Sequence, residues 1–246
     1  MIKRSIAIIS DIHGNDLALE AVLSDISNRN VNLIFNLGDS LYGPLNPFRT
    51  AEKLMGLNIT HIQGNCDRML LDTTSHTTSA TLISVKRELS KEHLSWLSQH
   101  SKTLIVEGIF LCHGTPESDE IYLLEEMSAE GGILKNITKI MESLKHIEQE
   151  VIVCGHSHIP RVVYLPDGKM VVNPGSVGLP AYMDELPIAH KMVSGTPHAK
   201  YAILEKLENE WIVEHIAVPY DWEKAANLAL QNNRADWATA IKYGTI

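Results

Sequence analysis

Residues 5–14 read SIAIISDIHG, and the order of residue types in this stretch decides the fold. Its first six positions form a mostly apolar run of the length of a strand. The polar residues Asp11 and His13 follow directly, and a helical repeat of apolar residues begins after Asp16. This order predicts a buried strand, then a loop that carries polar side chains, then a helix.

The same order returns further along the chain. An apolar run over residues 32–37 ends in Gly38-Asp39, and another over residues 58–63 ends in Gly64-Asn65. A helical segment lies between these two runs. Because strands alternate with helices, we predict a largely parallel sheet with helical crossovers.

The second half of the chain has a different pattern. Short apolar runs flank turn residues there, which indicates antiparallel hairpins and a second sheet packed on the first. The paired runs are residues 102–106 with 109–112, 162–165 with 170–173, and 201–206 with 211–218. We also predict a strand over residues 151–154, helices over 119–127 and 133–146, and loops over 73–81 and 184–198. The second of these loops is long enough to act as a lid or arm.

The composition is typical of a globular protein. The 246 residues are 44% hydrophobic and 21% charged, which excludes a collagenous, disordered or disulfide-scaffold chain. A net charge of −9 argues against a dedicated nucleic-acid or anionic-membrane binder. No run approaches 18 apolar residues, so we expect no membrane partner. We predict a single domain over residues 1–246, with residues 200–246 packed on it.

The three cysteines, Cys66, Cys112 and Cys154, are odd in number and lack CxxC spacing. The simplest interpretation is a reducing, cytoplasmic compartment. Cys112 and Cys154 end apolar runs, which favours buried packing for both. For Cys66, packing and a functional role are about equally favoured. We interpret the tryptophans, Trp237 among them, as packing residues.

Polar clusters follow five of the predicted strands. The carboxyl ends of strands lie along one edge of an α/β sheet, where ligand sites form, so we expect the clusters to converge. Their imidazole nitrogens and carboxylate oxygens suit Mn²⁺, Fe or Zn²⁺ rather than Ca²⁺. One carboxylate can bridge two ions, so the set suffices for a dinuclear centre of the kind that clamps a phosphoryl displacement. The candidate ligands are Asp11, His13, Asp39, Asn65, His113, His156 and His158.

Taken singly, these motifs have plainer interpretations. An Asp-x-His pair is rarely a metal site, a Gly-Asp pair is usually a turn, and a lone His113 is more often a hydrogen-bonded loop residue. The stretch Gly155-His156-Ser157-His158 is more specific, because the glycine permits a tight turn and histidines two apart can bind adjacent ions. Five such clusters in this order, each at the end of a strand, favour the metal centre.

The clusters together resemble the calcineurin-like metallophosphoesterase superfamily. The matching motifs are Asp11-x-His13, Gly38-Asp39, Gly64-Asn65-x-Asp67, His113-Gly114 and Gly155-His156-x-His158. Three further stretches are similar to its small bacterial and archaeal phosphodiesterase branch, which includes proteins related to diadenosine tetraphosphatase. These stretches are residues 38–44 (GDSLYGP), 173–178 (NPGSVG) and 218–221 (VPYD).

The resemblance implies an α/β fold of four layers, an αββα sandwich in which two mixed β-sheets lie face to face between helices. It also implies two divalent metal ions, with Mn²⁺ favoured and Fe, Zn²⁺ and Ni²⁺ as alternatives. A hydroxide between the ions would attack phosphorus in line, so no protein nucleophile is needed. The implied ligands are Asp11, His13, Asp39 and His158 for the first ion, and the bridging Asp39 with Asn65, His113 and His156 for the second.

The chain departs from the superfamily pattern at Cys66. Much of the superfamily has a His at this position, thought to protonate the leaving group or stabilise charge, with the following Asp supporting it. Cysteine removes that general acid and leaves Asp67 a supporting role. Among residues that contribute to catalysis we therefore predict Asp39, Asn65 and Asp67.

Other polar side chains are candidates for the missing proton donor or for phosphate contact. Three histidines in predicted loops could overhang the site: His76, His190 and His198. Arg68 could contact phosphate, although a surface or structural role is favoured about twofold.

The function that follows is a cytoplasmic, dinuclear metal-dependent phosphoesterase. Its substrate would be a small phosphorylated or nucleotide-type molecule, namely a phosphodiester, a dinucleotide polyphosphate or an activated phosphate ester. Two alternatives stay open. A non-catalytic relative that keeps the fold as an interaction surface is disfavoured by the full ligand set, and a protein Ser/Thr phosphatase by Cys66 and the short chain. The sequence leaves the physiological substrate, the native metal and the oligomeric state open, a homo-oligomer included.

Overall fold

The computed structural model describes residues 4–74, 79–128, 131–208 and 210–246. Two five-stranded sheets form its centre. In order across the first sheet, the strands are β14 (Glu210–Val218), β13 (Ala199–Leu207), β1 (Arg4–Ile9), β2 (Leu33–Asn36) and β3 (Thr60–His61). Across the second they are β4 (Thr103–Val106), β5 (Ile109–Cys112), β8 (Val151–Val153), β10 (Met170–Asn173) and β9 (Arg161–Tyr164).

Both sheets are mixed. Strands β1, β2 and β3 are parallel, as are β5, β8 and β10. Strand β13 pairs antiparallel with β1 and with β14, and β4 and β9 pair antiparallel with β5 and β10. Two short hairpins stand apart, β6 (Glu125–Ser128) with β7 (Gly131–Leu134) and β11 (Ala181–Asp184) with β12 (His190–Val193). The described helices are α1 (Asp16–Ser27), α2 (Pro47–Met55), α3 (Asn65–Leu71), α4 (Ala80–Glu88), α5 (Lys91–Leu97), α6 (Ile137–Ser143), α7 (Trp222–Gln231) and α8 (Ala235–Tyr243).

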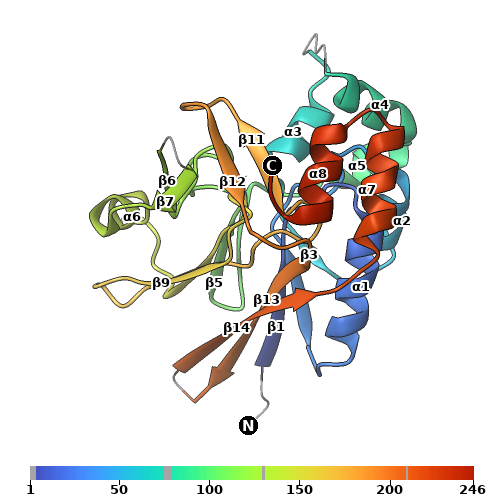
Figure 1. Cartoon of the computed structure of the whole chain (residues 1–246). Coiled ribbons are helices and arrows are strands. Elements are labelled where there is room, and N and C mark those ends of the chain that lie inside the picture. Colours follow the sequence, from blue (N-terminus) through green and yellow to red (C-terminus); the bar gives the residue numbers. More distant parts are fainter. Residues whose placement is uncertain (1–3, 75–78, 129–130, 209) are drawn as a thin grey trace.

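Successive side chains of a strand point to opposite faces of its sheet, and packing on both faces produces four layers. Ile6 and Ile8 of β1 point into the space between the sheets, where they belong to the same core as Leu111 of β5. Ala7 and Ile9 point to the other face and pack with α1. On the outer face of the second sheet, side chains of α6 join the core. Figure 1 shows the result, with α6 on one side of the sheets and α1 and α2 on the other. The predicted αββα sandwich is confirmed.

The helix predicted over residues 119–127 is wrong. Arg68 binds Asp119 through two hydrogen bonds, and Leu123 and Leu124 are buried against α6 in an irregular segment that leads into β6. These tertiary contacts override the helical repeat. The helix predicted over residues 133–146 is shorter, because β7 takes its beginning and α6 starts only after the side-chain cap of Asn136.

Three more differences concern loops and edges. The predicted loop over residues 184–198 contains β12. The last hairpin, β13 with β14, joins the first sheet, where β13 covers the edge of β1. The segment after it forms α7 and α8, which pack on each other, with α7 against α1 and α8 against β11. In the described part of the chain, no helix combines the length and apolarity needed to cross a bilayer.

A histidine stack at the edge of the first sheet predicts acid sensitivity. The rings of His61 and His100 stack at 4.8 Å, and Nδ1 of His61 is hydrogen-bonded to the side-chain amide of Asn36. Burial lowers the pKa of His61 to about 3 and that of His100 to about 4. Because the unfolded chain binds a proton near pH 6.5 and the folded chain does not, stability falls as the pH drops from 6.5 toward 3.

We therefore expect the unfolding free energy of the wild type to fall between pH 7.5 and pH 5. In His61→Gln the fall should be smaller by about 2 kcal/mol. Urea titrations at the two pH values measure this difference. His146→Gln, at an exposed position, is the matched control and should behave like the wild type. An unchanged pH dependence in His61→Gln would contradict the assignment.

Candidate metal centre

The candidate ligands converge at the carboxyl ends of the parallel strands. Asp11 and His13 follow β1, Asp39 follows β2, and Asn65 begins α3 just after β3. The remaining three, His113, His156 and His158, follow β5 and β8. Asn65 is half-buried and the others are buried. The structure therefore brings these residues together from the strand ends of both sheets.

Every histidine of the set is oriented by a backbone carbonyl. A carbonyl oxygen only accepts, so the ring nitrogen beside it carries a proton, and in the neutral ring the other nitrogen keeps a free lone pair. This pattern is typical of histidines that bind metal ions. The bonds are His13 Nδ1 to the oxygen of Tyr42 at 2.9 Å, His113 Nδ1 to Leu37 at 2.7 Å, His158 Nδ1 to Leu179 at 2.6 Å, and His156 Nε2 to Glu120 at 3.1 Å.

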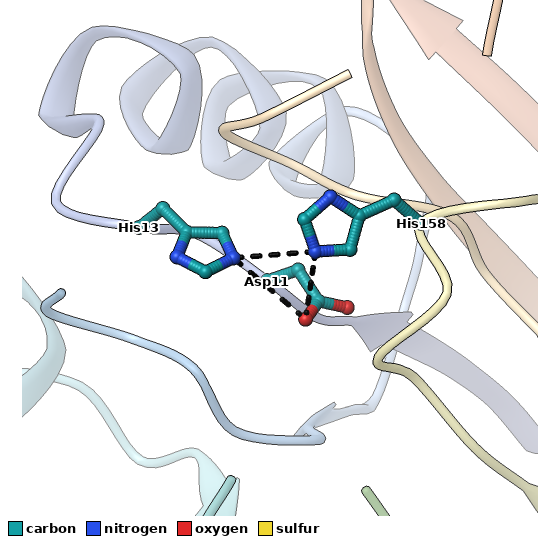
Figure 2. A group of neighbouring side chains, drawn as sticks. All are labelled: Asp11, His13 and His158. Atoms are coloured by element: carbon teal, nitrogen blue, oxygen red, sulfur yellow. Dashed lines mark hydrogen bonds and ion pairs between the residues drawn. The ribbon is translucent and has the colours of Figure 1, made fainter. Parts of the chain in front are cut away.

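Asp11, His13 and His158 form the first group, shown in Figure 2. The Nε2 atoms of the two histidines are 3.2 Å apart, although the carbonyl bonds leave a lone pair on each. Oδ1 of Asp11 lies 3.3 Å from Nε2 of His158 and 3.9 Å from Nε2 of His13, and it has no hydrogen-bond partner within the structure. Three buried acceptors that face one point fit a bound cation.

Asp39, Asn65 and His113 form a second group beside it. Nε2 of His113 lies 3.1 Å from Oδ1 of Asn65 and 3.5 Å from Oδ2 of Asp39. The same Asp39 oxygen is 4.0 Å from Nε2 of His13. One carboxylate oxygen thus faces a histidine of each group, the arrangement that a bridging ligand requires.

His156 lies at the side of this second group. Its ring centroid is 5.1 Å from that of His113, and its backbone N–H donates to Oδ2 of Asp11 at 3.2 Å. Since Nε2 binds the carbonyl of Glu120, Nδ1 is the nitrogen left for a metal ion. Burial lowers the pKa of His156 to about 4, which keeps the ring neutral.

The electrostatics of the site favour positive charge. Burial alone would raise the pKa of Asp11, but the charges of His158 and His113 lower it to about 2. Burial opposes protonation of His113, yet Asp39 and Asp11 raise its pKa to about 10. The pKa of Asp39 is lowered, because His113 and His13 outweigh the effect of burial. Two buried carboxylates therefore draw protons to the histidines, as they would draw metal ions.

Strained backbone holds these side chains in place. Asp11, His13, Asp39, His156 and His158 all have φ between 52° and 68°, in the left-handed region that residues other than glycine rarely adopt. Such strain persists only where the surrounding structure enforces it, and it is concentrated at functional sites. These five positions are a signal that the sequence alone did not provide.

The loop of Asp39 is fixed by its neighbours on α3. A Cβ on Gly64 would lie 2.2 Å from Oδ1 of Asp39, so only glycine permits this approach. The N–H of Cys66 donates to that oxygen at 2.8 Å, which leaves Oδ2 facing the histidines. Asp67 accepts from the backbone N–H groups of Asp39, Ser40 and Gly64 at 2.8 to 3.1 Å. Asp67 thus orients the Asp39 loop and does not line the cavity described below.

The thiol of Cys66 is buried beside the first group. Its sulfur, Nε2 of His13 and a carboxylate oxygen of Asp39 lie within 4.8 Å of one another. Burial, followed by the charges of Asp39 and Asp67, raises the pKa of the thiol well above its ordinary value. A protonated thiol is a poor nucleophile.

The centre opens into a cavity of about 310 Å³. Candidate ligands form part of its lining, and a further wall comes from Tyr42, from β11, and from α8 with the residue before it. This wall could not be predicted from the sequence, because the C-terminal helices carry no motif and the sequence around Trp237 indicates packing alone. The wall residues include Tyr42, Tyr182, Met183, Asp184, Arg234, Asp236 and Trp237.

The other polar candidates lie elsewhere. Arg68 is paired with Asp119 and Glu120. His190 is buried between the hydroxyl of Tyr122 and a backbone carbonyl, and His198 lies against the ring of Trp222; neither lines the cavity. His76 lies outside the described residues.

The sequence profile of the calcineurin-like phosphoesterase superfamily domain matches residues 5–195, more than half of the chain. The chain belongs to this superfamily. A protein from Methanocaldococcus jannaschii, described as uncharacterised, is 30% identical, with 96% of each chain covered. The crystal structure of a metallophosphoesterase from Sphaerobacter thermophilus is similar at a TM-score of 0.76 and 25% identity, with 98% of this chain and 99% of that chain covered.

Removal of the Asp39 carboxylate tests whether this residue is a ligand of both metal ions. Asp39→Asn removes the charge that faces both groups, so we expect less metal at both positions and activity lowered more than about a hundredfold. Asp11→Asn and His156→Ala should each mainly weaken one ion. Elemental analysis of purified variants measures the stoichiometry, with Asp167→Asn in the exposed turn before β10 as control. Two retained ions and near-normal activity in Asp39→Asn would exclude Asp39 as a ligand shared by the two ions.

Proposed function

We propose that the protein is a dinuclear metal-dependent phosphoesterase that hydrolyses a phosphodiester, a dinucleotide polyphosphate or an activated phosphate ester. The observation that supports it most strongly is the position of Asp39 Oδ2, 3.5 Å from His113 and 4.0 Å from His13. Family membership supports hydrolytic chemistry. The proposal also includes Mn²⁺ as the favoured ion and a reducing, cytoplasmic setting, consistent with three free, buried cysteines.

The roles of the residues follow from the geometry. Asp11, His13, His158 and Asp39 would hold one ion, and Asp39, Asn65, His113 and His156 the other. When bound, such a pair supplies Lewis acidity toward phosphoryl oxygens and lowers the pKa of water. The chain's own contribution is to fix the ring nitrogens through the backbone carbonyls and to turn Asp39 Oδ2 toward both positions. We assign Asp67 to holding the Asp39 loop.

The size and walls of the cavity support a small substrate. A volume of about 310 Å³ lies at the low end for small-molecule sites, and several aromatic rings line it. A phosphorylated protein would need a more open surface around the phosphate. Because α8 forms one wall of this cavity, we propose that residues 200–246 belong to the same domain as the ligands, in a single domain over residues 1–246.

The alternative of a non-catalytic interaction protein is less well supported. A scaffold would gain nothing from buried, strained acceptors such as Asp11 Oδ1, which finds no hydrogen-bond partner among the described residues. Such acceptors cost stability unless a cation binds them.

Replacement of Cys66 tests the absence of a covalent step. The mechanism needs no protein nucleophile, and the buried thiol is protonated. We expect Cys66→Ser to keep activity within about tenfold of the wild type, measured with Mn²⁺ and bis(p-nitrophenyl) phosphate. A trapped phosphocysteine would overturn this assignment.

Because the site lacks a general acid at position 66, we expect the rate of hydrolysis to depend steeply on the pKa of the leaving group. A positioned acid contributes roughly 10²–10⁴-fold in rate. The raised pKa of Cys66 makes its thiol a weak acid, and Asp67 accepts from backbone amides and does not line the cavity. Nitrophenyl esters should therefore react far faster than alkyl esters, in a series of rates plotted against leaving-group pKa. If chemistry limits the rate and the plot is flat, another residue supplies the proton.

A further inference from the structure

The residue before helix α8 places a cation at the wall of the cavity that also holds candidate ligands. Arg234, directly before α8, lines this cavity together with His13, Asp39 and Trp237. Among the described residues that line it, Arg234 is the only lysine or arginine. The superfamily profile ends at residue 195, so this residue lies outside the matched region.

The guanidinium is held rather than free to swing. Its Cζ lies 5.2 Å from the ring centroid of Trp237, whose ring meets the ring of His13 edge-on at 5.6 Å. Nη1 donates to Oγ1 of Thr81 on α4 at 2.6 Å. Nε and Nη2 donate to the carboxylate of Asp236 at 2.9 and 2.6 Å. The indole ring of Trp237 thus contacts both the fixed cation and one candidate metal ligand.

The guanidinium keeps capacity for an incoming anion. It has five N–H donors, and these three bonds, with a further interaction with the side chain of Tyr42, use only part of them. The side chain of Asp236 is 59% exposed, so its ion pair with Arg234 is open to solvent and contributes little stability. A phosphate could share or replace this carboxylate, since planar guanidinium groups match phosphate oxygens well.

We propose that Arg234 is a specificity-determining residue that binds a second phosphate of the substrate, next to the phosphorus that reacts. The cavity then selects nucleotide-type molecules with linked phosphates over esters with a single phosphate. Its volume of about 310 Å³ limits the enclosed part to roughly one nucleotide unit, and Tyr42 and Tyr182 offer rings against which a base can pack. This inference rests on the proposed function.

A substrate with linked phosphates also fits a site that has no general acid at position 66. In hydrolysis of a phosphoanhydride, the oxygen of water bonds to one phosphorus and the bridging P–O bond breaks. The bridging oxygen leaves with the neighbouring phosphate, and the proton of water goes to solvent. Because that phosphate is already a stable leaving group, no protonation by residue 66 is needed.

The test compares two substrates across matched variants. We measure kcat/KM with Mn²⁺ for diadenosine tetraphosphate and for bis(p-nitrophenyl) phosphate. Arg234→Gln should lower the ratio of the two values about ten- to a hundredfold, the usual worth of a charge-assisted hydrogen bond. Asp236→Asn removes the competing carboxylate and should lower KM for the tetraphosphate. Lys242→Gln removes a charge from the exposed side of α8, where Lys242 pairs with Glu223, and is the control.

Binding separates this inference from the proposed function. Calorimetric titration with adenosine 5′-(α,β-methylene)diphosphate should show weaker binding to Arg234→Gln than to the wild type and to Lys242→Gln, at equal metal content and unfolding midpoint. If this difference appears while the wild type hydrolyses neither substrate, only the proposed function fails. If the wild type is active and Arg234→Gln keeps both its substrate ratio and its affinity, the role of Arg234 is overturned. Arg234→Lys, which keeps the charge, should recover part of the affinity.

Discussion

Two carboxylates buried in the same space, those of Asp11 and Asp39, are the constraint on which the rest of the site depends. Removal of a carboxylate from water is costly unless charge or hydrogen bonds compensate for it. The backbone N–H groups of Cys66 and His156 each compensate one oxygen of a carboxylate, that of Asp39 and that of Asp11. The other oxygens face the imidazole nitrogens of His158 and His113. The fold therefore places two carboxylate oxygens that require positive charge close together. We propose that metal ions supply this charge.

The two sheets enforce that concentration. Parallel strands end at one edge, and their loops turn through left-handed conformations that a free peptide would avoid. Glycines pack where the loops meet, as Gly64 does against Asp39, and Asp67 ties three amides of neighbouring loops together. Strain in the loops is thus balanced by a core of close-packed aliphatic side chains between the sheets. We infer that the site depends on the whole sandwich, because the loops cannot hold this shape alone.

Much of this architecture could be predicted from the sequence. The strands before Asp11, Asp39 and His113 are apolar runs that end in polar clusters, so both their positions and their direction follow from pattern alone. The irregular segment around Leu123 could not be predicted, since its helical repeat is overridden by contacts with α6 and Arg68. The cavity wall at Arg234 was also missed, because α8 reaches it only through tertiary packing. The metal role of the seven candidate ligands stays a prediction.

The most direct test of the account is an anomalous diffraction measurement on crystals grown with Mn²⁺. We predict two manganese peaks about 3.5–4 Å apart, the separation typical of dinuclear sites. One peak should lie among Asp11, His13 and His158 and the other among Asn65, His113 and His156, with Asp39 between them. A single peak, or peaks away from these residues at saturating Mn²⁺, would contradict the account.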